Sequence, residues 1–215
     1  MPLSGAMQVN KVTGIIGLDL SVTGAGIAIL RFFDEGTVNI KTYNVGTKAT
    51  FGNIEKRIQY IVDFILANTT STDLVFIEDY AYGVKPGASS LATLAELGGV
   101  IKYIMHRRVG IWPCAISSTT IKQWLSGKGN IKKDSFLYWG LKKYGQDFKT
   151  GDEVVAHTIV DFAYFLLLNT LNNPKKFTKV ESSILEKYRK TVDYKKLILF
   201  LNGKEGPDGH ERFWA

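Results

Sequence analysis

The sequence predicts a mixed α/β domain in which helices flank a central sheet, followed by a C-terminal extension. Apolar runs of strand length alternate with longer segments whose apolar residues have helical spacing. The chain has 215 residues, 45% of them hydrophobic, so it is long enough for one core of substantial size. We place the domain at residues 11–171 and the extension, whose sequence indicates no role, at residues 172–215.

Three strands are predicted before the first helix. Residues 14–18 and 26–31 form two apolar runs, and the small residues between them, at 21–25, are typical of a tight hairpin. Residues 38–43 provide the third strand. The chain therefore begins with a β-β-β unit.

Helices then alternate with two further strands. Apolar residues recur at helical spacing over 53–68, and a stripe that includes Leu91, Leu94 and Leu97 marks a long helix. Glycines at 127 and 129 interrupt the helical pattern later in the chain. The expected helices span 53–68, 89–107, 118–125, 132–144 and 152–169, and the expected strands 74–78 and 109–116.

Two carboxylates follow apolar strands and carry most of the functional information. Asp19 comes after the run 14–18, and Glu78 comes after the run 74–77. A carboxylate at the end of a buried strand loses several kcal/mol of hydration unless it is paired, hydrogen-bonded or bound to a cation. A third polar cluster precedes the apolar run 162–168 and consists of Asp152, Glu153, His157 and Asp161. Three such segments together predict a divalent-metal site.

Charge and cysteine content narrow the class of protein. The chain has 27 Lys and Arg against 20 Asp and Glu, a net charge of +7, which favours a polyanionic partner such as nucleic acid. Cys114 is the single cysteine, so no intrachain disulfide forms, and we expect a buried thiol in a reducing compartment. No apolar run is long enough to span a bilayer, and the first ten residues lack signal-peptide character. We expect a cytoplasmic protein without a membrane partner.

Several segments together resemble the motifs of the RuvC family of Holliday junction resolvases, which have the ribonuclease H fold. The resemblance covers about residues 12–170 and is greatest to the phage-borne members, so it implies the cytoplasm of a phage host or a bacterium. The matching segments are Gly17-Leu18-Asp19 with residues 23–26, Ile77-Glu78, the helix from Ser89 to Val100, and a basic stretch with Lys122, Lys128, Lys132 and Lys133.

The last core helix departs from the family pattern. The family has an Asp-x-x-Asp pair near the start of this helix, whereas Val155 stands three residues after Asp152 here. Glu153, His157 and Asp161 fall within roughly 80° on one helix face. The resemblance favours His157 and Asp161 as partners of Asp19 and Glu78, with Glu153 as a further candidate metal ligand. Asp152 is expected to act only as an N-cap.

The resemblance implies a crossover junction endodeoxyribonuclease that uses Mg²⁺ or Mn²⁺, in a two-metal site, to hydrolyse phosphodiester bonds in four-way junctions. Asp19, Glu78, His157 and Asp161 would be its catalytic residues, and the active form would be a homodimer. A branched-DNA-binding protein that has lost the chemistry is the alternative, supported by Val155. A further alternative is another nuclease with the ribonuclease H fold.

The DNA-binding residues are also open to simpler interpretations. Lys122, Lys128, Lys132 and Lys133 lie beside a Gly-x-Gly turn, as suits a passing phosphate backbone, but they would also suit a solvated face. Tyr80 and Tyr82 follow Glu78 and either pack inside or stack on an unpaired base. Likewise, His157 would suit a core position in which its ring is hydrogen-bonded. Glu153 would suit the first turn of a helix, where a negative charge interacts favourably with the helix dipole.

Overall fold

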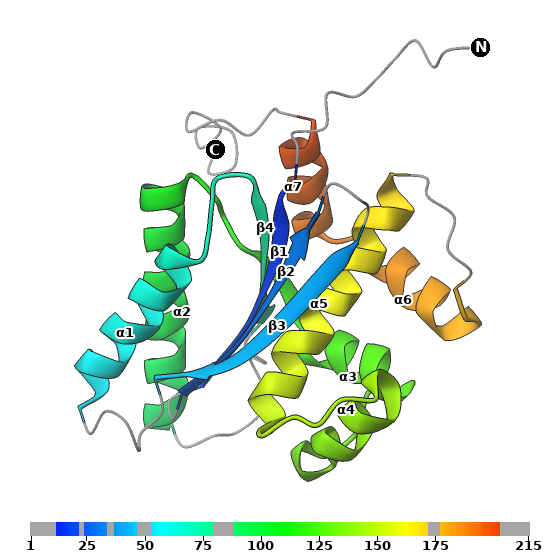
Figure 1. Cartoon of the computed structure of the whole chain (residues 1–215), viewed down its shortest axis with the longest axis horizontal. Helices are drawn as coiled ribbons and strands as arrows, with labels where there is room; N and C mark the ends of the chain where they lie inside the picture. Colours follow the sequence, from blue (N-terminus) through cyan, green and yellow to red (C-terminus); the bar gives the residue numbers. More distant parts are fainter. Residues whose placement is uncertain are drawn as a thin grey trace.

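The computed structural model describes residues 12–21, 24–33, 37–46, 53–79, 88–171 and 177–202. A five-stranded mixed sheet lies at its centre, in the order β3-β2-β1-β4-β5 (Figure 1). The antiparallel pairs are β1–β2 and β2–β3, and the parallel pairs are β1–β4 and β4–β5. The strands are β1 (Gly14–Ser21), β2 (Gly24–Phe32), β3 (Val38–Val45), β4 (Asp73–Asp79) and β5 (Cys114–Ser117).

Helices cover both faces of the sheet. Two helices, α1 (Ile54–Ala67) and α2 (Ala88–Val109), lie on one face, and α5 (Gly151–Thr170) crosses the other (Figure 1). The remaining helices lie on the α5 side and at the β5 edge; they are α3 (Ser118–Ser126), α4 (Phe136–Tyr144), α6 (Lys179–Tyr188) and α7 (Val192–Leu201). The predicted α/β architecture is confirmed.

Alternating side chains of the central strands divide the apolar interior into two cores. In β1, Ile16 and Leu18 pack toward α1 and α2, whereas Ile15 packs toward α5. Because successive side chains of a strand point to opposite faces, a strand covered on both faces is apolar at nearly every position. Asp19 interrupts this pattern, and its place in the alternation directs it to the α5 face.

Glycines bring α5 into close contact with β1 and β2. A Cβ atom at Gly17 would lie 2.6 Å from the carbonyl oxygen of Ala156, and a Cβ atom at Gly26 would overlap the backbone of Asp152. Only glycine fits such an approach. Since Gly26 is the register partner of Asp19, this contact places the first turn of α5 beside the Asp19 position.

Two expected elements differ from the structure. The strand predicted at 109–116 begins only at Cys114, because α2 continues to Val109 and ends at Gly110, which has φ +78°. Pro113 lacks the N–H group that a strand residue would donate to its neighbour. The helix predicted at 132–144 is divided into a 3₁₀ turn, η1 (Lys133–Ser135), and α4.

The C-terminal extension covers the β5 edge of the sheet. The Tyr188 hydroxyl donates to the carbonyl oxygen of Ala115 at 3.0 Å, and the Ala115 N–H donates to Asp193 Oδ1 at 3.1 Å. Cys114 is buried there as expected, with its Sγ 3.6 Å from the Asp193 carbonyl oxygen. These contacts occupy backbone groups that an edge strand would otherwise expose. No helix in the described ranges is long and apolar enough to cross a membrane.

Candidate metal centre at the start of α5

Asp19 and Glu78 lie side by side on the α5 face of the sheet. The register pairs Leu18 of β1 with Ile77 of β4, so the next residue of each strand is a carboxylate. Leu18 and Ile77 both belong to the core under α1 and α2. By alternation, Asp19 and Glu78 therefore point the other way, toward the start of α5. The structure brings together the two carboxylates that the sequence singles out.

Burial dominates the electrostatics of Asp19. Asp19 is 7% exposed, and desolvation raises the pKa of its carboxyl group well above the ordinary value. The charge of Glu78 and a hydrogen bond between the two carboxyl groups raise this pKa further, as does the charge of Asp152, whereas Lys133 lowers it. Two adjacent carboxylates cannot both ionise cheaply, and a bound cation would offset this cost.

Asp152 is the third carboxylate of the site, and its placement corrects the expectation that it is only an N-cap. The N-cap of α5 is Thr150, which forms a capping box with Glu153. The Asp152 carboxylate is thus free for another partner, and its Oδ1 lies 2.8 Å from Lys133 Nζ. Its charge also acts on Asp19. Asp152 therefore belongs to the carboxylate cluster.

Lys133 is the cation that partly balances this cluster. Burial alone would lower the pKa of its ammonium group, but the ion pair with Asp152 and the charges of Asp19 and Glu78 outweigh burial and raise it. Lys133 thus stays protonated beside Asp152. One ammonium faces three carboxyl groups, so the site has a deficit of positive charge.

The donor chemistry of the cluster fits a divalent cation. All three side chains are carboxylates, the preferred ligands of Mg²⁺ and Mn²⁺, and Asp19 is buried at a cost that a cation would offset. In the part of the chain that the structure describes, no three Asp, Glu, His or Cys side chains are already arranged to hold an ion. Lys133 instead stands against Asp152.

Glu153, a candidate metal ligand from the sequence, is occupied as a helix cap. Its Oε2 accepts hydrogen bonds from the backbone N–H groups of Lys149 at 2.6 Å and Thr150 at 3.2 Å. The Glu153 N–H donates in turn to Thr150 Oγ1. These bonds satisfy N–H groups that the first turn of a helix leaves free. The structure therefore gives Glu153 a capping role.

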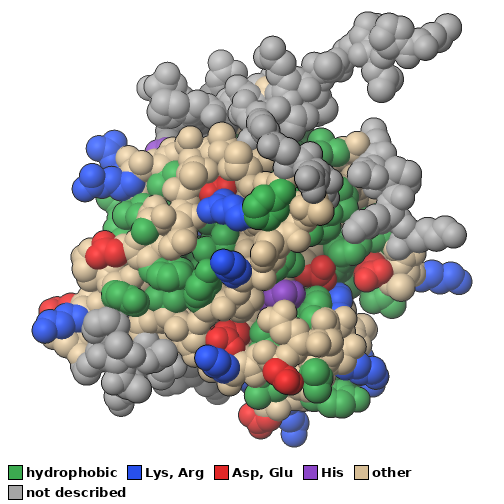
Figure 2. All heavy atoms as spheres, viewed as in Figure 1, with side chains coloured by type: hydrophobic (Ala, Val, Ile, Leu, Met, Phe, Trp, Pro, Cys, Tyr) green, Lys and Arg blue, Asp and Glu red, His purple; other side chains and the backbone are tan. Residues whose placement is uncertain are grey.

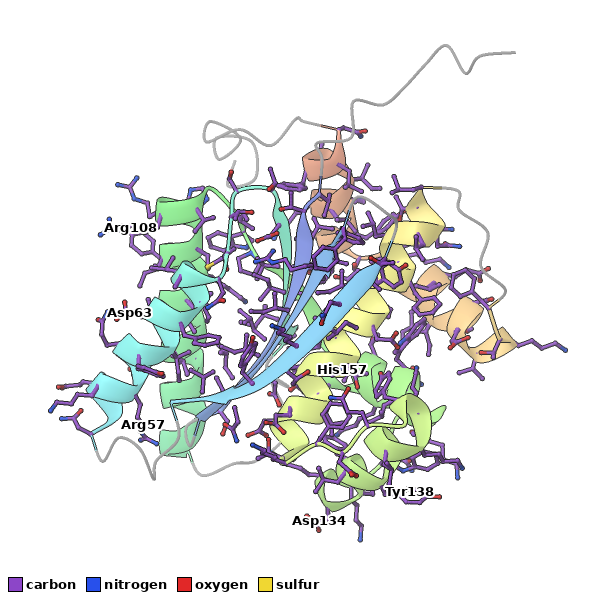
Figure 3. The ribbon with its side chains drawn as sticks, viewed as in Figure 1. Arg57, Asp63, Arg108, Asp134, Tyr138 and His157 are labelled. Carbon is purple, nitrogen blue, oxygen red and sulfur yellow. The ribbon has the colours of Figure 1, made fainter. Side chains whose placement is uncertain are left out.

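His157 lies in an aromatic enclosure between α5 and β3 (Figure 3). Its Nδ1 is 3.2 Å from Thr42 Oγ1, and its ring centroid lies 4.5 Å from Tyr144 and 5.1 Å from Phe148. Desolvation lowers the pKa of the imidazole, and the opposing effect of the Asp161 charge is smaller. The lowered pKa favours the neutral ring. His157 is placed with these core residues and not with Asp19 and Glu78.

Asp161 connects three helices on the same side of the sheet. Its Oδ2 accepts hydrogen bonds from Trp124 Nε1 of α3 at 2.8 Å and from the Tyr144 hydroxyl of α4 at 3.3 Å. Lys143 Nζ lies 3.5 Å from the same oxygen and donates to the Trp124 carbonyl oxygen at 2.5 Å. Asp161 thus fixes α3 and α4 to α5. The structure places Asp161 against Trp124, Tyr144 and Lys143, and its predicted catalytic role stays a prediction.

The face of α5 that meets β1 explains these placements. Ala156, Ile159 and Val160 contact Gly17 of β1, and Asp152 lies one turn before Ala156 on the same side. His157 faces Thr42 of β3 at the edge of the sheet, and Asp161 faces α3 and α4. The sequence signal for the side that faces β1 is the stripe of small and apolar residues that continues from Asp152, whereas Glu153, His157 and Asp161 mark a different, polar side.

The predicted DNA-binding lysines lie in one module, which comprises α3, the turn after it, η1 and α4. Lys122 is on α3, Lys128 is in the turn, and Lys132 and Lys133 begin η1. Gly127 ends α3 with φ +78°. Tyr80 and Tyr82 lie outside the described residues. Figure 2 shows acidic and basic side chains interspersed on the face in view, so the net positive charge is not concentrated there.

Known structures share this fold, although neither protein-family models nor curated proteins match the sequence. RuvC from T. thermophilus in complex with a Holliday junction substrate is similar, with a TM-score of 0.55 and 15% identity over 74% of this chain and 97% of that chain. A second T. thermophilus RuvC structure gives a TM-score of 0.51 and 16% identity over 73% and 97%. The chain therefore has the RuvC fold, a mixed five-stranded sheet flanked by helices.

Proposed function

We propose that the protein is a metal-dependent endonuclease that hydrolyses phosphodiester bonds in branched DNA, with the four-way junction as its substrate. The observation that carries the proposal is the buried Asp19 beside the half-buried Glu78, with Asp152 near enough for its charge to act on Asp19. Such a cluster has no structural benefit, because burial and mutual repulsion both oppose it. A cation and a polyanionic substrate would explain why it exists.

Asp19, Glu78 and Asp152 would hold Mg²⁺ or Mn²⁺ through carboxylate oxygens. A bound divalent ion supplies an activated water and charge stabilisation for the leaving oxygen of a phosphodiester displacement, and two ions would divide these tasks. The sheet fixes Asp19 and Glu78 in register, and the capped first turn of α5 fixes Asp152. Without a cation, the three carboxyl groups repel a phosphate.

The lysine module beside the carboxylates supports DNA as the substrate. Lys133 adjoins the cluster, and Lys128 and Lys132 are exposed in the same module. Phosphate contacts of this kind orient a backbone without reading its sequence. The structural similarity to a RuvC bound to a Holliday junction supports a branched substrate. A homodimer would supply two sites related by two-fold symmetry, which matches paired strand cleavage at a junction.

One observation favours the alternative of a branched-DNA-binding protein without catalysis. Lys133 already pairs with Asp152, and Val155 stands where an Asp would complete the family pair. In that protein the lysine would neutralise the cluster permanently, and no ion would enter. The two functions share the fold and differ in chemistry.

Incubation of the purified protein with labelled substrates tests the proposal. The substrates are a four-way junction, a linear duplex and an RNA–DNA hybrid, each in Mg²⁺, Mn²⁺ or EDTA. We expect cleavage of the junction to 5′-phosphate and 3′-hydroxyl ends in the presence of a metal and no cleavage in EDTA. Tight junction binding without cleavage in any metal would favour the alternative, and preferred cleavage of the hybrid would indicate a different nuclease.

A further inference from the structure

We propose that the Lys133 ammonium group is a resident cation of the carboxylate cluster, which a divalent ion displaces and which then becomes available to a DNA phosphate. The inference rests on the proposed function, because it concerns the same site. It adds a coupling between metal binding and DNA binding that passes through one side chain.

The ion pair is asymmetric in its exposure. The Asp152 side chain is 14% exposed, whereas that of Lys133 is 68% exposed, although their charged atoms lie 2.8 Å apart. The carboxylate is thus part of the interior of the site, and the lysine reaches it from outside. A long, exposed lysine side chain exchanges conformations readily, so the pair can open without disturbing the fold.

The backbone that carries Lys133 is held in place. The Ser135 hydroxyl donates to the Lys132 carbonyl oxygen at 2.7 Å, and the Ser135 N–H donates to the same oxygen at 3.1 Å. A Cβ atom at Gly151 would lie 3.7 Å from Lys133 Cε, so the lysine stem passes along the start of α5. Only the end of the side chain has to move when an ion arrives.

Lys133 and a divalent ion compete for the same charge. Asp152 is the direct partner of Lys133, and the Lys133 charge also acts on Asp19 and Glu78. An ion held by these carboxylates would lie within a few ångströms of the ammonium group and repel it. The displaced ammonium would stay beside the site, where a DNA backbone must approach. Metal and DNA would consequently each strengthen the binding of the other, because such a coupling is reciprocal.

The first test measures Mn²⁺ binding without DNA, from the electron paramagnetic resonance signal of the free hydrated ion. The Lys133→Met variant keeps the stem and removes the charge, so we expect it to bind Mn²⁺ at least about tenfold more tightly than the wild type. Lys133→Arg should bind like the wild type. Lys142→Met provides the control for net charge, because Lys142 is exposed on α4 and lies over the Trp139 ring; it should change the affinity little.

Equal Mn²⁺ affinity of the wild type and Lys133→Met would overturn the inference while leaving the proposed metal site intact, provided that Asp152→Asn weakens binding. Failure of all these proteins to bind Mn²⁺ would overturn the proposed metal site itself, and the inference with it.

A second test concerns the coupling to DNA. Junction affinity is measured by fluorescence anisotropy at constant ionic strength, with and without Ca²⁺, and intact DNA is verified on a denaturing gel. We expect Ca²⁺ to improve junction binding more for the wild type than for Lys133→Met, since only the wild type has an ammonium group to release. The same improvement in both proteins would show that Lys133 does not couple the two ligands.

Discussion

The Asp19 carboxyl group of β1 shares a hydrogen bond with the Glu78 carboxyl group of the parallel neighbour β4. Burial is the main reason why the pKa of Asp19 is raised, and the charge of Glu78 is the next. The folded, metal-free protein therefore disfavours the ionised form of Asp19 more than the unfolded chain does. This relationship makes the site a source of instability that a cation would relieve.

Asp19→Asn should stabilise the metal-free protein, and the gain should grow with pH. Because the folded pKa of Asp19 is raised, its favourable contribution is complete below the ordinary pKa of 3.8 and is lost as the pH rises through the folded value. Asparagine carries no charge and escapes this loss. Urea denaturation in EDTA between about pH 4 and pH 8 measures the difference. A gain that stays constant over this range would contradict the raised pKa.

Asp161→Ala should lower the free energy of unfolding without weakening Mn²⁺ binding. The change removes the acceptor of the Trp124 and Tyr144 hydrogen bonds and leaves the Lys143 ammonium without its carboxylate, at a cost of about 1.5–3 kcal/mol. Urea denaturation and Mn²⁺ titration measure the two effects. Asp63→Ala is the control, because Asp63 lies exposed on α1 (Figure 3). Loss of Mn²⁺ binding in folded Asp161→Ala would restore Asp161 to the metal site.

Changing Lys122 and Lys128 together to Ala should weaken binding to junctions of every sequence alike. If both lysines contact phosphates, the slope of log affinity against log salt concentration should fall by up to about two, because each phosphate contact contributes about 0.9. Anisotropy titrations at several salt concentrations give the slope. The matched control changes Lys56 of α1 and Lys187 of α6, which are exposed on other elements. An unchanged slope would make Lys122 and Lys128 part of a solvated face.

Most of the fold was predictable because the central strands are covered on both faces. Such strands appear in the sequence as uninterrupted apolar runs, and a carboxylate at the end of a run, such as Asp19 or Glu78, is conspicuous. The boundaries of β5 were less predictable. Residues 109–116 are largely apolar, but Gly110 and Pro113 confine the strand to its last part.

The third carboxylate was not predictable from local spacing. Asp152 and Glu153 are both suited to the first turn of a helix, and only the contact of α5 with Gly17 and Gly26 determines which one faces the sheet. His157 and Asp161 share a polar face, but long-range partners such as Trp124 use that face to attach α3 and α4. Helical periodicity shows that a face exists and does not show which neighbour it contacts.

The rate of junction cleavage by Asp152→Asn tests the central claim most directly, because Asp152 distinguishes the observed carboxylate cluster from the His157–Asp161 alternative. Single-turnover rates in Mn²⁺ are compared for the wild type, Asp152→Asn and Asp134→Asn, an exposed acidic neighbour of Lys133 that serves as the charge-matched control (Figure 3). Since a metal ion supplies several kcal/mol of transition-state stabilisation, we expect Asp152→Asn to lose at least about a hundredfold in rate and the control to lose little. A fully active Asp152→Asn would contradict the account.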